Sequence, residues 1–429
     1  MSQAKTTDIK QYRDLLEPLT EEFEDVVVEE PVVETQPEVS TTDTADTTFT
    51  ELNPSLEHDR YFLQWLKSSN QSLLISSYKT NYVFNIGSAT LLKPEVRDQL
   101  SFWMTSVARP MGMCVSGNDI YIGTMTKLMK YTRFPQAKTD EGVDDDGVKF
   151  KRSDFDGYYV PRQMNVVGDI DIHDIVVDKN KEVYFVSALF CSVLKKSETH
   201  SFQVFWRPPW ISKSAAEDRC HLNGLCAVNG VPRYVTSVAR TNVRGAWRNG
   251  RVGGGVVWDM VENKLVCANL SMPHSPRWHN GKLWLLNSGC GEFGFIDFKK
   301  IAKTSEGEVY HPFIAKCFVP AYLRGLCFVG NDFAVIGKSQ DRYEKTFQGL
   351  PLGEKLLKNK IESSCGICVI DLNRFDIVHE LTLNKPITEI YDVVSLPNVT
   401  RPMLEVDQVS VVSQLFDFVD NTSEMKPKK

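Results

Sequence analysis

The chain has 429 residues, of which 42% are hydrophobic, and its formal net charge is −6. The hydrophobic share is enough for a folded core, and we find no uninterrupted apolar stretch of about 18 residues and no apolar leader, so we expect neither a membrane span nor an export signal. Lysine and arginine are dispersed rather than gathered in a basic stripe, which argues against nucleic-acid binding. We therefore predict a cytoplasmic protein that contacts neither membrane nor nucleic acid.

Residues 1–52 are predicted to form a disordered acidic tail. Residues 1–51 hold 14 Asp and Glu against three Lys and Arg, a balance of −11, which leaves +5 for the rest of the chain. Such a segment cannot bury enough apolar surface to offset the entropy lost on ordering. One interpretation is that the tail docks a protein partner, and the other is that it is only a solvated leader.

Ordered structure is expected from residue 53. Asn53 is a suitable N-cap and Pro54 a suitable first helical residue, so we predict a short helix that packs on the domain behind it. Its apolar face would comprise Tyr61, Phe62, Trp65 and Leu66. Three strand-like runs follow at residues 72–78, 81–87 and 100–107.

A short phrase then returns roughly every fifty residues, each time at the start of an apolar strand. Its copies are RPMGMCV from Arg109, DIHDIVV from Asp171, HLNGLCA from His221, PHSPRW from Pro273, LRGLCFV from Leu323 and ITEIYDVV from Ile387. Turn residues precede β-branched or aromatic runs, as at Asn118-Asp119 before residues 120–122, which is typical of hairpins. A repeat of this size predicts an all-β fold, a six-bladed β-propeller over residues 53–405, with 406–429 as a C-terminal extension.

The ends of the repeat region predict how the ring closes. The last copy has only one clear strand before Pro397, whereas three strands precede the first copy. We expect the N-terminal strands to pair with the C-terminal strand and complete the sixth blade, which leaves no free sheet edge at the seam. Two insertions, 139–157 and 338–364, are further candidate docking segments for a protein partner.

The ten cysteines are predicted to be reduced thiols that pack in the core. Cys114, Cys226 and Cys327 occupy matching places in three repeats, too far apart to bridge. Cys365 and Cys368 have CxxC spacing, but they lie in a strand-like run and no second CxxC would complete a zinc site.

One position of the repeat varies, and it should carry the chemistry. Its residues are Met111, His173, Asn223, His274, Arg324 and Glu389. Because the innermost strand of every blade runs along the axis, these side chains are expected to face one funnel. His221 lies two residues before Asn223 and should share its strand face.

Two chemistries fit this set. In the first, His173, His274, Glu389 and Asn223 hold one divalent metal ion that polarises a carbonyl group. In the second, His173 and His274 act as a metal-free acid and base. A structural alternative pairs Arg324 with Glu389.

The sequence thus predicts a small anionic or carbonyl-bearing ligand in the funnel, with hydrolysis or isomerisation as the reaction. The predicted catalytic residues are His173, His274 and Glu389. The predicted ligand-binding residues are Arg324, Asn223, His221, Arg277 and Asn287. The alternative is a non-catalytic propeller that binds a protein.

The fourth repeat also carries a family resemblance. The stretch PHSPRWHNGKLWLLNSGCGE at 273–292, with LRGLCFVGNDFAVIGKS at 323–339 and ITEIYDVVSLPNVTRP at 387–402, resembles an uncharacterised conserved family of propeller-like proteins, a domain of unknown function. The resemblance spans residues 60–402. It implies the fold and no particular activity.

Overall fold

The computed structural model describes residues 55–89, 99–134, 141–143, 149–340, 348–407 and 415. All of them belong to the unit Ala45–Lys429, one of two units into which the chain divides, the other being Met1–Thr44. The predicted acidic tail and nearly all of the C-terminal extension lie outside the described residues.

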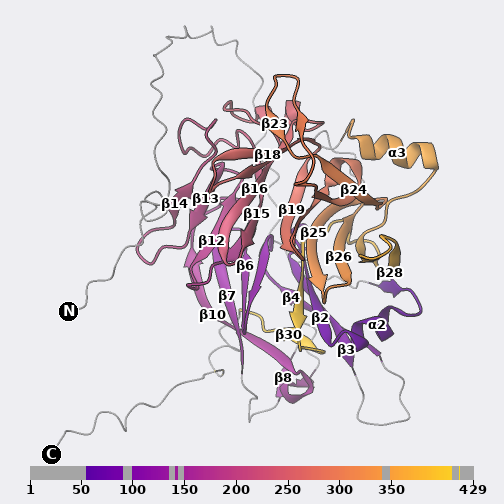
Figure 1. Cartoon of the computed structure of the whole chain (residues 1–429). Helices are drawn as coiled ribbons and strands as arrows, with labels where there is room; N and C mark the ends of the chain where they lie inside the picture. The colour runs from indigo at the N-terminus through magenta and orange to yellow at the C-terminus, as the bar shows by residue number, and fades with distance from the viewer. Residues whose placement is uncertain are drawn as a thin grey trace, which may run out of the picture. The chain divides into compact units, whose positions relative to one another are not determined.

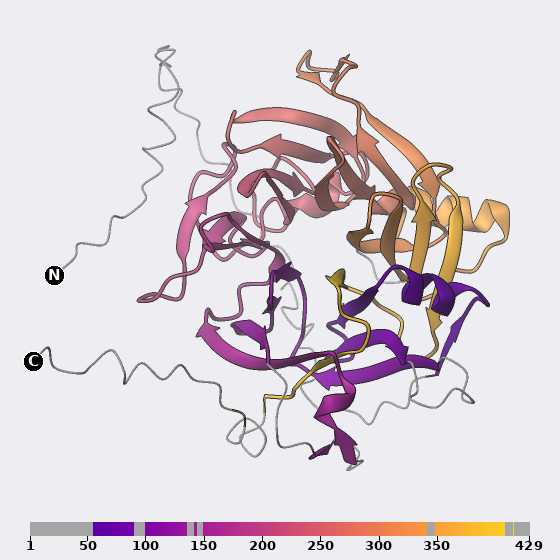
Figure 2. The ribbon, with the colours of Figure 1, turned by 60° about the horizontal axis from the view of Figure 1, so that its bottom comes forward.

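The described strands form a six-bladed β-propeller, as predicted (Figures 1 and 2). The first blade consists, from the axis outward, of β5 (Met113–Ser116), β6 (Asp119–Gly123), β7 (Lys127–Arg133), β10 (Gly157–Val166) and β30 (Pro402–Leu404). The second consists of β11 (Ile172–Val177), β12 (Val183–Ser187), β13 (Ser192–Lys195) and β14 (Gln203–Trp206). The third consists of β15 (Leu222–Val228), β16 (Val231–Ser237), β17 (Gly255–Asp259) and β18 (Lys264–Leu270).

The remaining blades continue the ring. The fourth consists of β19 (Pro273–His279), β20 (Lys282–Asn287), β21 (Glu292–Ile296) and β24 (Phe313–Phe318). The fifth consists of β25 (Tyr322–Val329), β26 (Phe333–Ser339), β27 (Gly366–Asp371), β28 (Ile377–Leu383) and β1 (Leu56–His58). The sixth consists of β29 (Asp392–Pro397), β2 (Gln71–Ser77), β3 (Tyr82–Ala89) and β4 (Gln99–Ser106).

Smaller elements lie between these strands. They are β8 (Glu141–Val143) paired with β9 (Lys149–Lys151), β22 (Ala302–Lys303) paired with β23 (Val309–Tyr310), the 3-10 helices η1 (Arg152–Asp154), η2 (Ala246–Gly250) and η3 (Ser288–Cys290), and the helices α2 (Phe62–Ser68) and α3 (Pro351–Asn359). Within the described part of the chain, neither α2 nor α3 is long and apolar enough to cross a membrane.

The ring closes as predicted. β29 pairs antiparallel with β2 from Gln71–Pro397 to Ser76–Asp392, so the innermost strand of the sixth blade comes from the C-terminal side and its other strands from the N-terminal side. Two shorter strands cross the seam: β30 runs parallel to β10, and β1 runs antiparallel to β28.

The predicted N-terminal helix starts later than expected. Residues 56–58 form β1, because the outer edge of β28 offers unpaired backbone groups that an extended segment can satisfy. Helix α2 then buries Phe62, Trp65 and Leu66 in the hydrophobic cluster shared by the fifth and sixth blades, as predicted. Tyr61, the fourth residue of the predicted apolar face, is 56% exposed.

The three repeat cysteines lie in the innermost strands or beside them, as unbridged thiols. Burial raises the pKa of Cys114, Cys226 and Cys327 to about 12 in each case. Thiols this hard to ionise are poor nucleophiles and poor metal ligands, so these residues serve packing.

Where the fifth and sixth blades meet, only glycine fits. Gly325 has φ +76°, and a Cβ atom there would lie 2.4 Å from the backbone nitrogen of Val393. Gly330, in the same blade, has φ +60° and open space around it. We expect Gly325→Ala to lower the free energy of unfolding by about 2 kcal/mol or more beyond the effect of Gly330→Ala, which carries only the backbone strain of about 1–2 kcal/mol. Urea-induced unfolding of both variants measures the difference, and equal losses would contradict this account of the blade contact.

Candidate functional site

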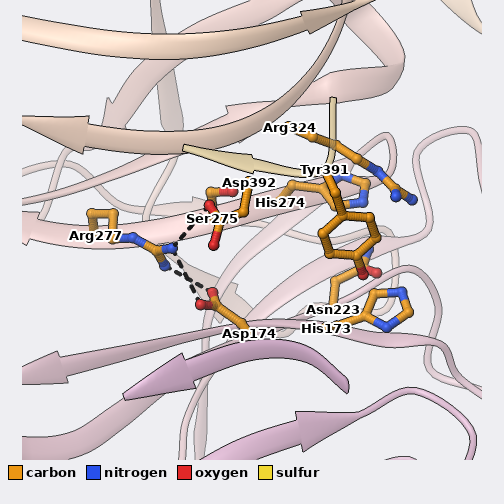
Figure 3. A pocket seen from close by; sticks show the side chains of 9 residues that line it. All are labelled: His173, Asp174, Asn223, His274, Ser275, Arg277, Arg324, Tyr391 and Asp392. Atoms are coloured by element: carbon orange, nitrogen blue, oxygen red, sulfur yellow. Dashed lines mark hydrogen bonds and ion pairs between the residues drawn. The ribbon is translucent and has the colours of Figure 1, made fainter. Parts of the chain in front are cut away.

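The structure brings four of the six predicted ring residues into one small cavity on the propeller axis (Figure 3). His173, Asn223, His274 and Arg324 line it, together with Asp174, Ser275, Arg277, Tyr391 and Asp392. The cavity has a volume of about 10 Å³, which is space for about one water molecule. One polar group of a ligand therefore fits inside without rearrangement.

Two equivalent aspartates reveal the correct register of the sixth blade. One carboxylate oxygen of Asp174 accepts the backbone N–H of Leu225 in the next blade at 3.0 Å. Asp392 accepts the backbone N–H of Met113 in the next blade at 2.8 Å. Each aspartate also accepts the N–H of the residue that follows it. The two aspartates thus hold the same place in their blades.

This register corrects the alignment of the last repeat. If Asp392 corresponds to Asp174, then Tyr391 corresponds to His173, and Glu389 corresponds to Asp171, two residues earlier. Tyr391 indeed lines the cavity, whereas Glu389 does not. Matching IYDVV to IHDIV on the shared aspartate would have shown this in the sequence.

Glu389 is engaged elsewhere. Its carboxylate is fully buried and accepts hydrogen bonds from the Ser77 hydroxyl at 3.1 Å and from the Lys79 backbone at 3.2 Å. Met111, the ring position of the first blade, is buried but also does not line the cavity. The position of Glu389 gives no support to its predicted catalytic and metal-binding roles.

The two imidazoles of the cavity are held in one tautomer. Nδ1 of His173 lies 3.1 Å from the carbonyl oxygen of Asp171, and Nδ1 of His274 lies 2.8 Å from that of Met272. A carbonyl oxygen only accepts, so in each neutral ring Nδ1 carries the proton and Nε2 is left as an acceptor.

Both imidazoles are neutral at physiological pH. Burial lowers the pKa of His173 to about 4. Burial, and then the charge of Arg324, holds the pKa of His274 well below its ordinary value. Among the described residues that line the cavity, Arg324 and Arg277 carry permanent positive charges, and Arg324 is the one beside the imidazoles.

Arg324 is buried among aromatic side chains. Its guanidinium carbon lies 4.6 Å from the ring centre of Tyr391 and 5.8 Å from that of Tyr322, and its Nε has no hydrogen-bond partner among the described residues. Burial lowers the pKa of Arg324, but Tyr391, the other tyrosines and then Glu389 raise it, so its pKa lies above the ordinary value.

Unsatisfied polar atoms converge on this cavity. Among the described residues, buried side-chain atoms without a hydrogen-bond partner include Asn223 Oδ1, His274 Nε2, Arg324 Nε and Tyr391 Oη. A buried polar group left unpaired costs about 1–3 kcal/mol. Four of them around one cavity form a set of donors and acceptors suited to a polar ligand.

The guanidinium of Arg277, in contrast, is bound by carboxylates of the protein itself. It donates to both oxygens of Asp174, at 2.8 and 3.2 Å, and lies 3.8 Å from Asp392. Figure 3 shows this ion pair apart from Arg324 and Tyr391. Arg277, predicted to bind ligand, lines the cavity, and its guanidinium also joins the blades at the axis.

Two further predicted residues lie outside the cavity lining. Asn287 accepts the Ser271 backbone N–H at 2.7 Å and donates to Glu292 at 2.9 Å, which fixes a turn beside η3. His221 lies next to the cavity, with its ring centre 4.9 Å from that of His173.

The sequence reasoning missed Asp174, Ser275, Asp392 and Tyr391, although a signal was present. The residue after the ring position alternates around the propeller between glycine and a side-chain acceptor: Gly112, Asp174, Gly224, Ser275, Gly325 and Asp392. Ser275 continues the pattern, because its hydroxyl accepts the Gly325 N–H at 3.1 Å. Each acceptor joins its blade to the next one.

The residues present do not fit the predicted divalent ion. Within the described ranges, no group of three or more His, Cys, Asp or Glu side chains is placed to hold a metal ion. The carboxylates of Asp174 and Asp392 also line the cavity, but Arg277 binds the first at 2.8 Å and lies 3.8 Å from the second. Glu389 is bound to Ser77 and Lys79, so the imidazole and amide groups that remain lie beside the charged guanidinium of Arg324. That charge would repel a cation.

The sheets and the cavity define the chain as a six-bladed β-propeller with a polar site on its axis. It belongs to the family described as Domain of unknown function (DUF4915), whose model matches residues 60–404, so the resemblance to an uncharacterised family is confirmed. A search of curated proteins finds no match.

Solved structures with a similar fold include three enzymes. One is a catalytically inactive variant of virginiamycin B lyase from Staphylococcus aureus with quinupristin (10% identity, TM-score 0.32, 77% of this chain and 100% of that chain covered). Another is a gluconolactonase from Xanthomonas campestris (10% identity, TM-score 0.39, 74% and 86% covered). The third is a luciferin-regenerating enzyme (9% identity, TM-score 0.34, 82% and 100% covered). Similarities at this level carry no argument about activity.

The Arg277 ion pairs predict a pH-dependent loss of stability. Burial raises the pKa of Asp392 from 3.8 to about 7 even beside Arg277. A carboxyl group whose pKa is higher in the folded chain than in the unfolded chain makes the fold less stable as the pH rises. The reason is that the group loses its proton at lower pH in the unfolded chain. In Arg277→Met the two carboxylates lose their counter-charge. We expect a loss of about 3–5 kcal/mol at pH 8 and a clearly smaller loss at pH 5.5, measured by urea unfolding. A loss independent of pH would contradict the proposed role of Arg277.

The unpartnered hydroxyl of Tyr391 predicts a gain in stability. We expect Tyr391→Phe to raise the free energy of unfolding by about 1 kcal/mol, because it removes a buried polar group that lacks a partner. Tyr158→Phe is the matched control, since the Tyr158 hydroxyl bonds to Glu405 and receives the Arg152 Nε–H at 2.9 Å. The control should lose stability in the same urea titration. A loss in both variants would show that Tyr391 is satisfied.

Proposed function

We propose that the axial cavity binds a small anionic ligand through Arg324. The observation that carries this proposal is a buried guanidinium whose Nε has no hydrogen-bond partner among the described residues and which lies against the ring of Tyr391. A carboxylate suits this group, because a guanidinium can donate two parallel hydrogen bonds to it. Such a ligand would offset the cost of keeping the charge buried.

The cavity's buried polar atoms without a hydrogen-bond partner indicate which chemical groups the ligand should carry. Arg324 and Tyr391 offer donors, whereas Asn223 Oδ1 and His274 Nε2 offer acceptors. A molecule that carries a carboxylate or carbonyl next to a hydroxyl group would satisfy both kinds. Because the cavity holds about one water volume, the rest of the ligand would lie in its mouth. Small hydroxy acids and their lactones meet these conditions.

The chemistry proposed for the cavity is metal-free. Its imidazoles can exchange protons with a ligand, whereas its residues do not fit a metal ion. Binding of a protein by the insertions or the acidic tail, and a cytoplasmic location, stay predictions.

Binding of hydroxy acids to the Arg324→Gln variant tests the proposal. We expect the wild-type chain to bind at least one of glycerate, threonate and gluconate. The variant should bind about 10- to 100-fold more weakly, because it loses a charge-assisted hydrogen bond. Isothermal titration calorimetry measures both.

The controls test whether binding requires the carboxylate of the ligand and the guanidinium of Arg324. Glycerol and sorbitol lack the carboxylate and should not bind, and Arg374→Gln, which changes an exposed arginine paired with Asp371, should bind like wild type. Failure of all three acids to bind, or equal binding by both variants, would overturn the proposal and favour the protein-binding alternative.

A further inference from the structure

We propose that His221, held in place by Asp218, is the general base for hydrolysis of a lactone or ester whose carbonyl oxygen binds at Arg324. This inference rests on the proposed function of the axial cavity and adds a reaction to it. The sequence singled out neither Asp218, which lies in a loop, nor Trp247, which lies in η2, because both are outside the repeated strand phrase.

Asp218 and Trp247 fix the imidazole of His221 from two sides. The Asp218 carboxylate oxygens lie 3.0 and 3.1 Å from His221 Nδ1. The Trp247 indole N–H donates to the same carboxylate at 2.7 Å, and its ring stacks on His221 at 4.2 Å between centroids. The carboxylate can only accept when ionised, so Nδ1 carries the proton and Nε2 has the lone pair of a base.

The backbone of this segment is held in an uncommon conformation. Asp218 has φ +42° and His221 has φ +51°, both in the left-handed region that residues other than glycine rarely occupy. At His221 this conformation belongs to the repeat, because the equivalent residues Arg109, Asp171 and Met272 also have positive φ, whereas Asp218 lies outside that pattern. The two conformations direct a carboxylate and an imidazole toward each other across a three-residue turn.

The imidazole of His221 borders the cavity through its contact with His173. The side chain of His221 is 11% exposed and that of His173 is 4% exposed, and among the described residues we find no hydrogen bond to Nε2 of either ring. The rings of His173 and His221 meet edge to face. A ligand group seated at Arg324 would place its neighbouring atoms beside this pair.

Of the three imidazoles, His221 is the one that a carboxylate holds at hydrogen-bond distance. His173 and His274 have backbone carbonyls at Nδ1, and burial disfavours their charged forms. The Asp218 carboxylate lies 3.0 Å from His221 Nδ1, whereas the Asp171 carboxylate lies 3.7 Å from His173 Nδ1. Burial opposes ionisation of Asp218, but the charge and Nδ1–H of His221 and the indole of Trp247 hold the pKa of Asp218 below its ordinary value. This is the arrangement that orients the histidine in acyl-transfer enzymes.

The step balances without a metal or another cofactor. Nε2 of His221 removes a proton from a water molecule, whose oxygen forms a bond to the carbonyl carbon. The oxyanion that develops accepts hydrogen bonds from Arg324 and Tyr391. When it collapses, the ring or ester C–O bond breaks, and the leaving alkoxide takes the proton back from His221. The products are a carboxylic acid and an alcohol, joined as one hydroxy acid if the substrate is a lactone.

Hydrolysis by the full-length chain, treated with EDTA, tests the proposal. The probes are δ-valerolactone, D-glucono-1,5-lactone and p-nitrophenyl acetate, followed by proton or nitrophenol release. We expect at least one probe to be hydrolysed, and His221→Gln to lower kcat about 100- to 10,000-fold with little change in KM. His311→Gln removes an outer imidazole bound to the Lys300 carbonyl and should match wild type.

Asp218→Asn tests the positioning role with a spectroscopic readout. Asparagine offers one acceptor where two N–H groups, from His221 and Trp247, now donate to a carboxylate. We expect kcat to fall at least about 10-fold and His221 to shift partly to the Nε2–H tautomer, visible in its ¹⁵N chemical shifts. An unchanged tautomer with unchanged kcat would show that Asp218 only supports the fold.

The outcomes separate the two proposals. If hydroxy acids bind through Arg324 but no probe is hydrolysed, the hydrolysis inference is wrong and the binding site stands. If His221→Gln keeps wild-type kcat, or if EDTA abolishes activity, the metal-free role of His221 is wrong. If neither acids nor probes interact with the chain, both proposals fail.

Discussion

The propeller depends on one buried ion-pair network at its axis. Arg277 of the fourth blade binds Asp174 of the second and lies beside Asp392 of the sixth. The same three side chains reach the backbone of the other blades, at Met113, Leu225 and Leu326. All six innermost strands therefore share one set of polar contacts. Breaking such a network leaves uncompensated charge in a low-dielectric interior, so its geometry is strongly constrained.

The axis consequently contains two buried guanidinium groups with opposite surroundings. Arg277 is neutralised by carboxylates, whereas Arg324 has aromatic rings, neutral imidazoles and an amide around it. The first group joins the blades, and the second is the group that we propose binds a ligand. A ligand that satisfies Arg324 would also stabilise the folded chain by mass action, since only the folded state assembles its partners.

Much of the fold and part of the site could be predicted from the sequence. The blade number and ring closure followed from a repeated strand phrase, because each copy must face the same axis. The start of α2 was misplaced because pairing of β1 with β28 is a tertiary contact without a local signal. Glu389 was assigned by spacing alone, and a two-residue shift keeps the same strand face. The role of Arg277 and the link from Asp218 to His221 depend on side chains that meet only in the folded ring.

The seam between the chain's two ends has a consequence for biosynthesis. Asp392 donates its N–H to Ser76 across 316 residues of sequence, and β2 has no partner on that side until β29 emerges from the ribosome. Five blades can assemble before β29 is translated, and until then the edge of β2 that pairs with β29 stays exposed. Contacts so distant in sequence slow folding. Nascent chains of this protein should therefore be most prone to aggregation just before the last segment is translated, when chaperones would have most to protect.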